Sequence, residues 1–437
     1  MVQTMEQEQQ LQWKQVATSK GGVTMMIKKK QKLTCLVLSI AFGLANLVLG
    51  SAGPREPIPT LAALEDVLTL TNAADVQGLP AVAWSPACDR FLVVWQDRRN
   101  GIDDDIWGRY VSGAGHEAAS AEFNLTPNRA GNQRAPAVAY QPVFNQFIVV
   151  WMDDQAGNWD IYGQYFDCYK MPTSDLIAIS TTPASQQYPD VACRYDIAWV
   201  VWHDLRKNNS DIYGQRVDPL GLLLGNNIAV SGAPSEQTYP AIAANPDDTG
   251  CTLESFMVTW RDFRNGDASS LDIYDQQLTD VGLCGLNQPV YTGGRAQAFP
   301  DLDYGASDDR YLIVWQDDQA ATTAWDIYGR KTLPNGLPDG GAFPISTASQ
   351  NQWLPAVAYN GNDNEFLVVW QDYRVGANWN IAGQRVSGAG VLLGGNFPIA
   401  TAIGDEMNPA VAYGNVAAHY FVVWEQGGNI FGRAYWP

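Results

Sequence analysis

A tryptophan that ends a short apolar run recurs seven times along this chain of 437 residues. The first copy reads Phe91-Leu92-Val93-Val94-Trp95-Gln96-Asp97 and is followed by Asp105-Ile106-Trp107-Gly108. The recurring tryptophans lie 51 to 58 residues apart: Trp95, Trp151, Trp202, Trp260, Trp315, Trp370 and Trp424. A repeat of roughly 50 residues that holds several short strands is typical of a propeller or another repeat array.

The first six repeats each contain four predicted strands. In the sixth repeat they are Pro355–Tyr359, Phe366–Trp370, Asn380–Val386 and Phe397–Thr401. The continuously apolar second strand suits a position covered on both faces, as in blades packed around an axis. The alanine-rich first strand is expected innermost, because blades crowd together near the axis. We therefore predict an all-β, seven-bladed β-propeller made of four-stranded antiparallel blades.

The two ends of the repeat array predict how the ring closes. The seventh repeat stops at Pro437 after its third strand, and Val67–Thr71, ahead of the first repeat, has the outer-strand pattern. We expect this N-terminal strand to complete the last blade, which removes free sheet edges. If the same strand were inserted into a neighbouring molecule, it would build a polymer, so self-assembly is an alternative.

The N-terminus carries an export pattern. The basic segment Met26–Lys32 precedes the apolar run Leu33–Leu49, and small residues follow it. This is typical of a secretory signal peptide, although an uncleaved anchor is an alternative because the run is nearly long enough to span a bilayer. The predicted organisation is residues 1–25, a possible non-native extension; 26–52, the signal peptide; 53–66, a linker; and 67–437, the propeller.

The charge balance limits the possible partners. The chain has 27 Lys and Arg against 46 Asp and Glu, and only Lys170, Lys207 and Lys331 follow the signal segment among the lysines. Phosphate-binding surfaces need clustered basic residues. We therefore expect a secreted or cell-surface protein that contacts no nucleic acid, and no membrane after signal cleavage.

The repeat motif resembles one found in known proteins. The patterns Val-Val-Trp-x-Asp-x-Arg and Asp-Ile-Tyr-Gly-Gln-Arg, the latter at Asp211–Arg216, are similar to repeats of secreted and surface-associated bacterial β-propeller proteins, many without an assigned activity. The resemblance covers Val67 to Pro437. It implies an extracellular propeller and transfers no catalytic residue.

An aspartate stands two residues after the tryptophan in six repeats, and the seventh has Gln426 there. An arginine follows two residues later in four of them, as Arg99 does after Asp97. We interpret these aspartates as a structural clasp that binds loop amides or the arginine. A ring of cation-binding carboxylates is the alternative. Catalysis requires one asymmetric constellation, so we assign the repeated tryptophans to the core as well.

Function on a repeated scaffold is expected where the repeat is broken. Asp190, Asp301 and Asp303 replace inner-strand alanines in the third and fifth repeats, and His203 and Arg261 stand between Trp and Asp in the third and fourth. These residues could hold a polar ligand or a cation, or His203 could act as a general base. The alternative is that the carboxylates bind water and the neighbouring backbone.

Additional tryptophans suggest sugar binding. Trp159, Trp325 and Trp379 lie in loops between second and third strands, and Trp353 precedes an inner strand. Both kinds of loop fall on one face of a propeller. An aromatic ring beside Asp and Asn suits a sugar, which has an apolar face and hydroxyl groups. The alternative is that each ring packs over its own blade.

The cysteines predict disulfide bonds, and the acidic loops suggest at most a calcium site. The favoured disulfide is Cys251–Cys284, with Cys168–Cys193 as a weaker second pair and Cys88 left unpaired. We expect no cofactor. Calcium at Asp103-Asp104-Asp105 is possible, although the segment lacks the alternating spacing of a calcium loop.

Three functions remain open. The leading hypothesis is a non-enzymatic binding or adhesion module for glycans or surface proteins. The first alternative is an extracellular polysaccharide hydrolase or lyase, which would need two carboxylates converging in one cleft. The second is a structural subunit of an extracellular assembly or filament.

Overall fold

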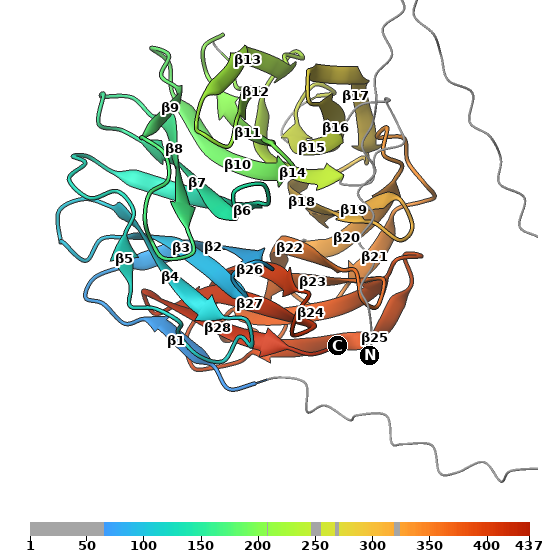
Figure 1. Cartoon of the computed structure of the whole chain (residues 1–437). Coiled ribbons are helices and arrows are strands. Elements are labelled where there is room, and N and C mark those ends of the chain that lie inside the picture. The colour runs from blue at the N-terminus through green and yellow to red at the C-terminus, as the bar shows by residue number, and fades with distance from the viewer. Residues whose placement is uncertain (1–64, 208, 246–254, 267–270, 319–323) are drawn as a thin grey trace, which may run out of the picture. The chain divides into compact units, whose positions relative to one another are not determined.

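The computed structural model describes residues 65–207, 209–245, 255–266, 271–318 and 324–437. Over these residues, 28 strands form seven four-stranded antiparallel sheets. The sheets are blades arranged in a ring, with the first strand of each blade nearest the centre (Figure 1). The predicted seven-bladed propeller is confirmed. The predicted extension 1–25, signal peptide 26–52 and most of the linker lie outside the described residues.

The blades follow one another along the chain. Blade 1 comprises β2 (Gln77–Ser85), β3 (Arg90–Asp97), β4 (Asp105–Ser112) and β5 (Phe123–Asn124). Blade 2 comprises β6 (Gln133–Gln141), β7 (Gln146–Asp153), β8 (Asp160–Asp167) and β9 (Ile177–Ser180). Blade 3 comprises β10 (Gln186–Arg194), β11 (Ile197–Asp204), β12 (Asp211–Val217) and β13 (Leu223–Ser231). Blade 4 comprises β14 (Gln237–Asn245), β15 (Ser255–Asp262), β16 (Asp272–Thr279) and β17 (Gly282–Tyr291).

The last three blades complete the ring. Blade 5 comprises β18 (Gln297–Gly305), β19 (Arg310–Asp317), β20 (Asp326–Thr332) and β21 (Phe343–Ser346). Blade 6 comprises β22 (Gln352–Asn360), β23 (Glu365–Asp372), β24 (Asn380–Ser387) and β25 (Leu392–Ala400). Blade 7 comprises β26 (Glu406–Gly414), β27 (His419–Gln426), β28 (Asn429–Tyr435) and β1 (Leu68–Thr71).

The N-terminal strand closes the ring. β1 pairs antiparallel with β28, with Leu68 opposite Gly432, and the two strands lie side by side in Figure 1. Leu70 is fully buried in a cluster that also holds residues of blades 1 and 7. The expectation that this strand completes the last blade is confirmed, with a start one residue later than predicted.

The core lies between blades rather than inside one. Each of the seven hydrophobic clusters combines buried residues of two adjacent blades. The second strands supply most of this packing, because both of their faces are covered; Phe91 to Trp95 are all fully buried. A continuously apolar strand is the sequence consequence of that position.

The recurring spacing of Trp, Asp and Arg produces a clasp in blades 1, 3, 4 and 6. In blade 1 the Trp95 Nε1–H donates to Asp97 Oδ2 at 2.8 Å, and Arg99 donates to both Asp97 oxygens. The Arg99 guanidinium also lies 3.7 Å from the centroid of the Trp107 ring. Because Asp97 is fully buried, this pairing satisfies its charge. The structural interpretation of the aspartates is confirmed for these blades.

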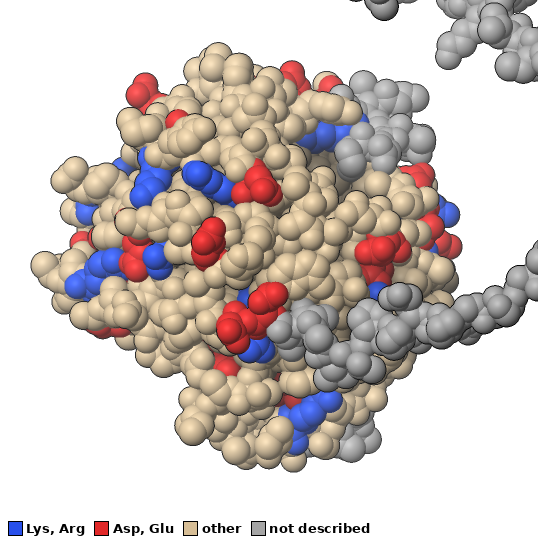
Figure 2. Space-filling model, turned by 60° about the horizontal axis from the view of Figure 1, so that its bottom comes forward, with Lys and Arg blue, Asp and Glu red and all other residues tan. Residues whose placement is uncertain are grey.

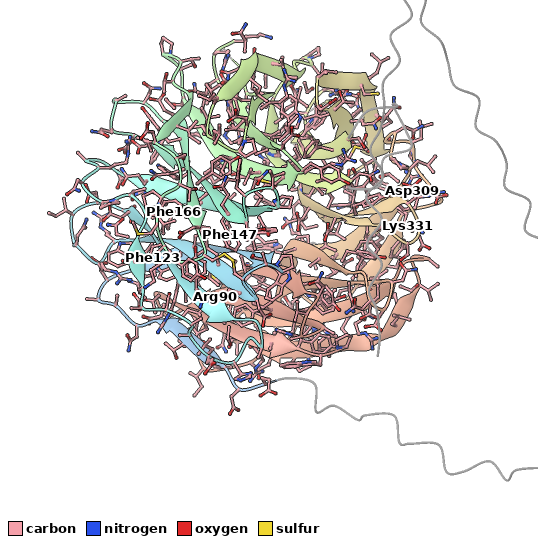
Figure 3. The ribbon with its side chains drawn as sticks, in the orientation of Figure 1. Arg90, Phe123, Phe147, Phe166, Asp309 and Lys331 are labelled. Atoms are coloured by element: carbon pink, nitrogen blue, oxygen red, sulfur yellow. A yellow bond between two sulfur atoms is a disulfide. The ribbon has the colours of Figure 1, made fainter. Side chains whose placement is uncertain are left out.

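One disulfide corrects the cysteine prediction. Cys168 pairs with Cys88, and Cys193 is free, so the predicted Cys168–Cys193 pair is wrong. The turn after β2 meets the turn after β8 of the next blade, where Arg90 donates to the Cys168 carbonyl at 3.0 Å, beside Phe147 (Figure 3). Cys193 instead packs within the seam between blades 2 and 3. Cys284 is disulfide-bonded, while its predicted partner Cys251 lies outside the described residues.

The surface carries mixed charges. On the face drawn in Figure 2, acidic and basic side chains lie in small groups separated by uncharged surface. Among the described residues, no helix is long and apolar enough to cross a membrane.

Candidate functional site

Each inner strand bulges at the residue before its proline. Seven such residues have φ between 48° and 53°: Leu79, Ala135, Tyr188, Tyr239, Phe299, Leu354 and Asn408. The register of the first strand pair shifts at the same place, for example between Gln187 and Asp190 in blade 3. A bulge twists a strand locally and redirects its side chains. Its sevenfold occurrence makes it a property of the repeat, placed beside the loops that carry the additional tryptophans.

The bulges are joined by hydrogen bonds between neighbouring blades. The residue between Trp and Asp of one blade accepts from the backbone N–H of the pre-proline residue in the next. Gln316 Oε1 accepts from Leu354 at 3.1 Å, and Gln371 Oε1 accepts from Asn408 at 3.2 Å. The same contact joins Glu425 to Leu79 and Gln96 to Ala135.

This pattern changes in one sector of the ring. Blades 2, 3 and 4 place Met152, His203 and Arg261 at the accepting position. A thioether is a weak acceptor and a guanidinium accepts no hydrogen bond. His203 Nδ1 lies 3.5 Å from the Tyr239 nitrogen, a long contact. The sector from blade 2 to blade 5 therefore gives up an interaction that the other blades use.

The same sector carries three aromatic residues at consecutive bulges. The ring centroids of Tyr188 and Tyr239 are 5.0 Å apart, and those of Tyr239 and Phe299 are 4.7 Å apart. We call Tyr188, Tyr239 and Phe299 the aromatic arc. Tyr188 is 37% exposed, and the other two rings are half-buried. The other four bulges have Leu79, Ala135, Leu354 and Asn408, so this arc has no counterpart at the remaining described bulges.

Arg261 lies over the arc. Its guanidinium is 4.8 Å from the centroid of the Tyr239 ring and 5.7 Å from that of Phe299. Its Nε–H donates to Thr238 Oγ1 at 3.0 Å. Burial lowers the pKa of Arg261, but an arginine remains charged at any physiological pH. The stacked cation thus presents further N–H donors beside an aromatic surface.

His203 is held as a neutral ring beside Tyr188 and Tyr239. Its centroid lies 5.4 Å from that of Tyr188. Nε2 lies 3.2 Å from Gln187 Oε1, and Nδ1 faces the Tyr239 N–H, so a proton on Nε2 fits both contacts. Burial, and then the charge of Arg261, lowers the His203 pKa to about 4. A histidine that stays neutral at pH 7 supplies one donor and one acceptor.

The inner-strand carboxylates bind the neighbouring blade. Asp190 Oδ2 accepts from the Ile242 N–H at 2.8 Å, Asp301 Oδ2 from Val357 at 2.8 Å, and Asp303 Oδ2 from Tyr359 at 2.7 Å. These bonds satisfy amides on the free edge of the next inner strand, so the alternative of bonding to neighbouring backbone is confirmed.

The same carboxylates have altered acidity. They remain partly accessible near the axis but are closely surrounded by protein. Burial raises the pKa of Asp190 to about 6, of Asp303 to about 6 and of Asp301 to about 7, and the Asp190 charge adds to the shift at Asp301. They therefore titrate within the physiological range.

The four predicted tryptophans do not form one cluster. All are half-buried. Trp159, Trp325 and Trp379 lie between second and third strands as expected, but Trp353 lies within the inner strand β22 and not before it. The first residues of the inner strands bond to the tryptophan loops: the Gln186 N–H donates to the Trp159 carbonyl, and that of Gln352 donates to Trp325. Trp353 and Trp379 contact each other with centroids 4.6 Å apart. Trp159 instead lies near Arg134, whose guanidinium is 5.8 Å from its ring.

The acidic segment of blade 1 is bound by protein donors. Asp103 Oδ1 accepts from Asn100 Nδ2 at 2.6 Å, and Asp104 forms an ion pair with Arg134. Burial, followed by the charge of Asp103, raises the pKa of Asp105 to about 6. In the part of the chain that the structure describes, no group of three or more His, Cys, Asp or Glu side chains is arranged to hold a metal ion.

Sequence reasoning found His203 and Arg261 but missed the aromatic arc. The signal was available, since the residue before the inner-strand proline reads Leu, Ala, Tyr, Tyr, Phe, Leu, Asn around the ring. The structure shows that the aromatic residues at this position contact one another across adjacent blades.

Comparisons with known proteins support the architecture. No protein-family model matches the chain, and no curated protein matches its sequence. The fold is similar to a Penicillium chrysogenum alpha-L-arabinanase solved with arabinobiose, with a TM-score of 0.53 and 11% identity over 75% of this chain and 100% of that one. It is also similar to the GH93 alpha-L-arabinofuranosidase of Fusarium graminearum, with a TM-score of 0.51 and 10% identity over 75% and 99% of the two chains. At such low identity these similarities establish a shared propeller fold and nothing further.

Proposed function

We propose that this chain is a non-enzymatic, carbohydrate-binding propeller whose glycan lies over the aromatic arc. The observation that carries the proposal is the contact of Tyr188, Tyr239 and Phe299 across three blades, in the sector where Met152, His203 and Arg261 replace the usual acceptor. In this sector the sequence departs from the repeat, and the hydrogen bonds that join the bulges of the other blades are lost or lengthened. A departure from the repeat that gives up stabilising hydrogen bonds is expected at a functional site, here a binding site.

The chemistry of the sector suits a neutral sugar. Aromatic rings contact the apolar face of a sugar, and nearby polar groups bind its hydroxyls. Arg261 supplies donors, Gln187 supplies a donor and an acceptor, and His203 stays neutral because its pKa is about 4. Two similar propellers were solved with arabinobiose, so arabino-oligosaccharides are suitable first probes.

The test is calorimetric titration and a glycan array on the purified protein. Tyr239→Ala is expected to weaken binding at least about tenfold, since it removes the central ring of the arc. The matched control, Leu354→Ala, changes the same bulge in blade 6 and should leave affinity unchanged. If folded protein binds no glycan, or if both variants lose affinity equally, the proposal is wrong.

We further propose that the protein is secreted. The basic and apolar segments at residues 26–49 support export. The Cys88–Cys168 disulfide supports an oxidising compartment. N-terminal sequencing of protein recovered from the medium or cell surface tests this, and a start at Gly53 is expected. Protein found only in the cytosol would contradict it.

A hydrolase is a second candidate, favoured by one observation. The negative charge of Asp190, whose pKa is about 6, helps to raise the pKa of Asp301 to about 7. A pair of carboxyls in which the charge of one raises the pKa of the other is the kind of arrangement that general acid–base chemistry on glycosides uses. Release of sugars from arabino-oligosaccharides that is lost in Asp301→Asn would support hydrolysis. Intact substrate after prolonged incubation with glycan-binding protein would exclude it.

Self-assembly stays a separate proposal. It would require β1 to pair with β28 of another copy instead of its own. Size-exclusion chromatography with light scattering distinguishes the two arrangements, because a closed ring elutes as a monomer.

A further inference from the structure

The seventh blade lacks the clasp. Its second and third strands are joined by the two-residue turn Gly427-Gly428, with Gln426 opposite Asn429 and φ values of 58° and 78°. Such a turn needs two residues with positive φ, which glycine provides. In blade 1, by contrast, the equivalent loop runs from Asp97 to Asp105. The short turn leaves no place for the clasp arginine.

The indole of blade 7 is left without an acceptor. Trp424 is fully buried, and its Nε1 has no hydrogen-bond partner among the described residues. In the other six blades the equivalent N–H donates to an aspartate, at 2.7 to 3.4 Å. Gln426 does not replace that aspartate: its Nε2–H donates to the Ile403 carbonyl at 3.2 Å, and its oxygen accepts nothing from Trp424.

The polar network that fills the neighbouring seam is missing too. In blade 4, Asn287 accepts from Arg264 at 3.2 Å and donates to Gln276 at 2.9 Å, and it also donates to the Val230 carbonyl of blade 3. Strand register places Val67 and Arg433 of blade 7 at the positions of Asn287 and Gln276. Neither replacement can form the same set of bonds.

A groove occupies this seam between blades 6 and 7. It has a volume of about 1180 Å³ and is lined by the 400–407 loop, the 424–428 hairpin and the segments around Val67 and Asp75. Trp424, Phe431 and Arg433 belong to its wall. Blade 7, which supplies much of this lining, lies across the ring from blades 3 and 4 (Figure 1), and those two blades carry Tyr188 and Tyr239 of the aromatic arc.

The lining selects the chemistry of a ligand. Trp424 Nε1–H and Arg433 Nε–H lack partners among the described residues, so both need an acceptor. Four carboxylates also line the groove: Asp75, Asp405, Glu406 and Glu425. Each accepts a backbone N–H through one oxygen, so further donors from a ligand would meet the remaining acceptor capacity. A hydroxyl group both accepts and donates. The acidic lining disfavours an anion, because it would face a net negative charge.

We propose that this groove is a second carbohydrate site, which binds a neutral saccharide through a hydroxyl that accepts from Trp424 Nε1. The Phe431 ring provides an apolar surface for the sugar, and Ile403, almost fully exposed at the rim, provides another. The hydroxyl takes the place that the aspartate oxygen holds in the other six blades. The site is independent of the proposed function at the arc.

The test follows individual indole N–H resonances in ¹⁵N-labelled protein. The Trp424 resonance is the one that disappears in Trp424→Phe, and the Trp370 resonance, from a clasped indole, is identified by Trp370→Phe. The probes are arabino-, xylo-, cello- and manno-oligosaccharides, with oligogalacturonate as the anionic probe. At least one neutral probe is expected to shift the Trp424 resonance and to leave that of Trp370 in place.

Two variants complete the test. Gln426→Asp gives Trp424 the carboxylate found in six blades and is expected to weaken groove binding at least about tenfold. Tyr239→Ala should leave the Trp424 shift unchanged, so failure at the arc and failure at the groove are distinguishable. The proposal is overturned if no neutral probe moves the Trp424 resonance, if only oligogalacturonate does, or if Gln426→Asp binds as tightly as the parent.

Discussion

The indole N–H of Trp260 donates a 2.7 Å hydrogen bond to Oδ2 of Asp262, two residues further along the same strand. Residues two apart in a strand share a face, so this pair needs no loop to bring it together. Arg264 then donates to both oxygens of Asp262. One short motif thus satisfies a buried indole, a buried carboxylate and a guanidinium.

Removing that carboxylate is expected to be costly. Asp262→Asn should lower the free energy of unfolding by about 3 kcal/mol, because Arg264 loses its counter-ion in a mostly buried position. Urea unfolding monitored by fluorescence measures the change. Asp175→Asn, at an exposed aspartate, is the control and should stay within about 0.5 kcal/mol of the parent. Equal effects of the two substitutions would contradict the structural role of the clasp.

Arg261 stands where other blades have a hydrogen-bond acceptor, so replacing it should raise stability and weaken binding. Arg261→Gln restores the residue type that accepts from the next bulge in blades 1, 5 and 6, here from Phe299. Stability should rise by about 1 kcal/mol, the net value of one added hydrogen bond. Glycan affinity should fall, since the stacked cation is lost. A variant that is less stable and binds normally would show that Arg261 serves packing alone.

Asp275, whose carboxyl is buried in blade 4, is expected to lower the stability of the protein as the pH rises. It replaces the glycine of the repeat, both of its oxygens lack partners among the described residues, and burial raises its pKa well above the usual value. The folded state therefore holds a proton that the unfolded state releases above about pH 4, and stability falls as pH rises. Asp275→Asn should remove this cost, with an advantage over the parent that grows by about 1.4 kcal/mol per pH unit. Unfolding curves at pH 5 and pH 6 test it; a constant difference would contradict it.

His419, at the seam between blades 7 and 1, is expected to have the opposite effect and to lower stability as the pH falls. Its ring stacks on Trp436 with centroids 4.7 Å apart, and burial lowers its pKa to about 4. Below about pH 6.5 the unfolded state gains a proton that the folded state resists, so stability is lost between pH 6.5 and pH 4. His419→Phe should flatten that part of the profile. Thermal melting of both proteins across this range provides the measurement, and parallel profiles would exclude His419 as the cause.

The sequence predicted most of the architecture because the repeat encodes local structure. The run Phe91–Trp95 is apolar at every position, as a strand covered on both faces requires, and the missing outer strand of the last repeat was recognisable at Val67–Thr71. These features depend on residues within one blade or at its two ends.

Contacts between blades were harder to predict. The Cys88–Cys168 disulfide and the contact of Tyr188 with Tyr239 both join residues of neighbouring blades that lie about 50 to 80 residues apart. Their spacing does not reveal which turns meet, because that depends on how adjacent sheets are rotated about the axis. The three inner aspartates were located correctly, but their bonds to the next blade followed only from the three-dimensional register.

The closure of the ring by β1 also sets a schedule for folding. β1 is made first, and its partner β28 is completed about 360 residues later. At a synthesis rate of about 5 to 20 residues per second, that interval lasts roughly 20 to 70 seconds. Throughout it, the earliest strand and the most recent blade both present unpaired backbone to any neighbouring chain. The pairing of β28 with β1 is therefore the step that removes both unpaired edges.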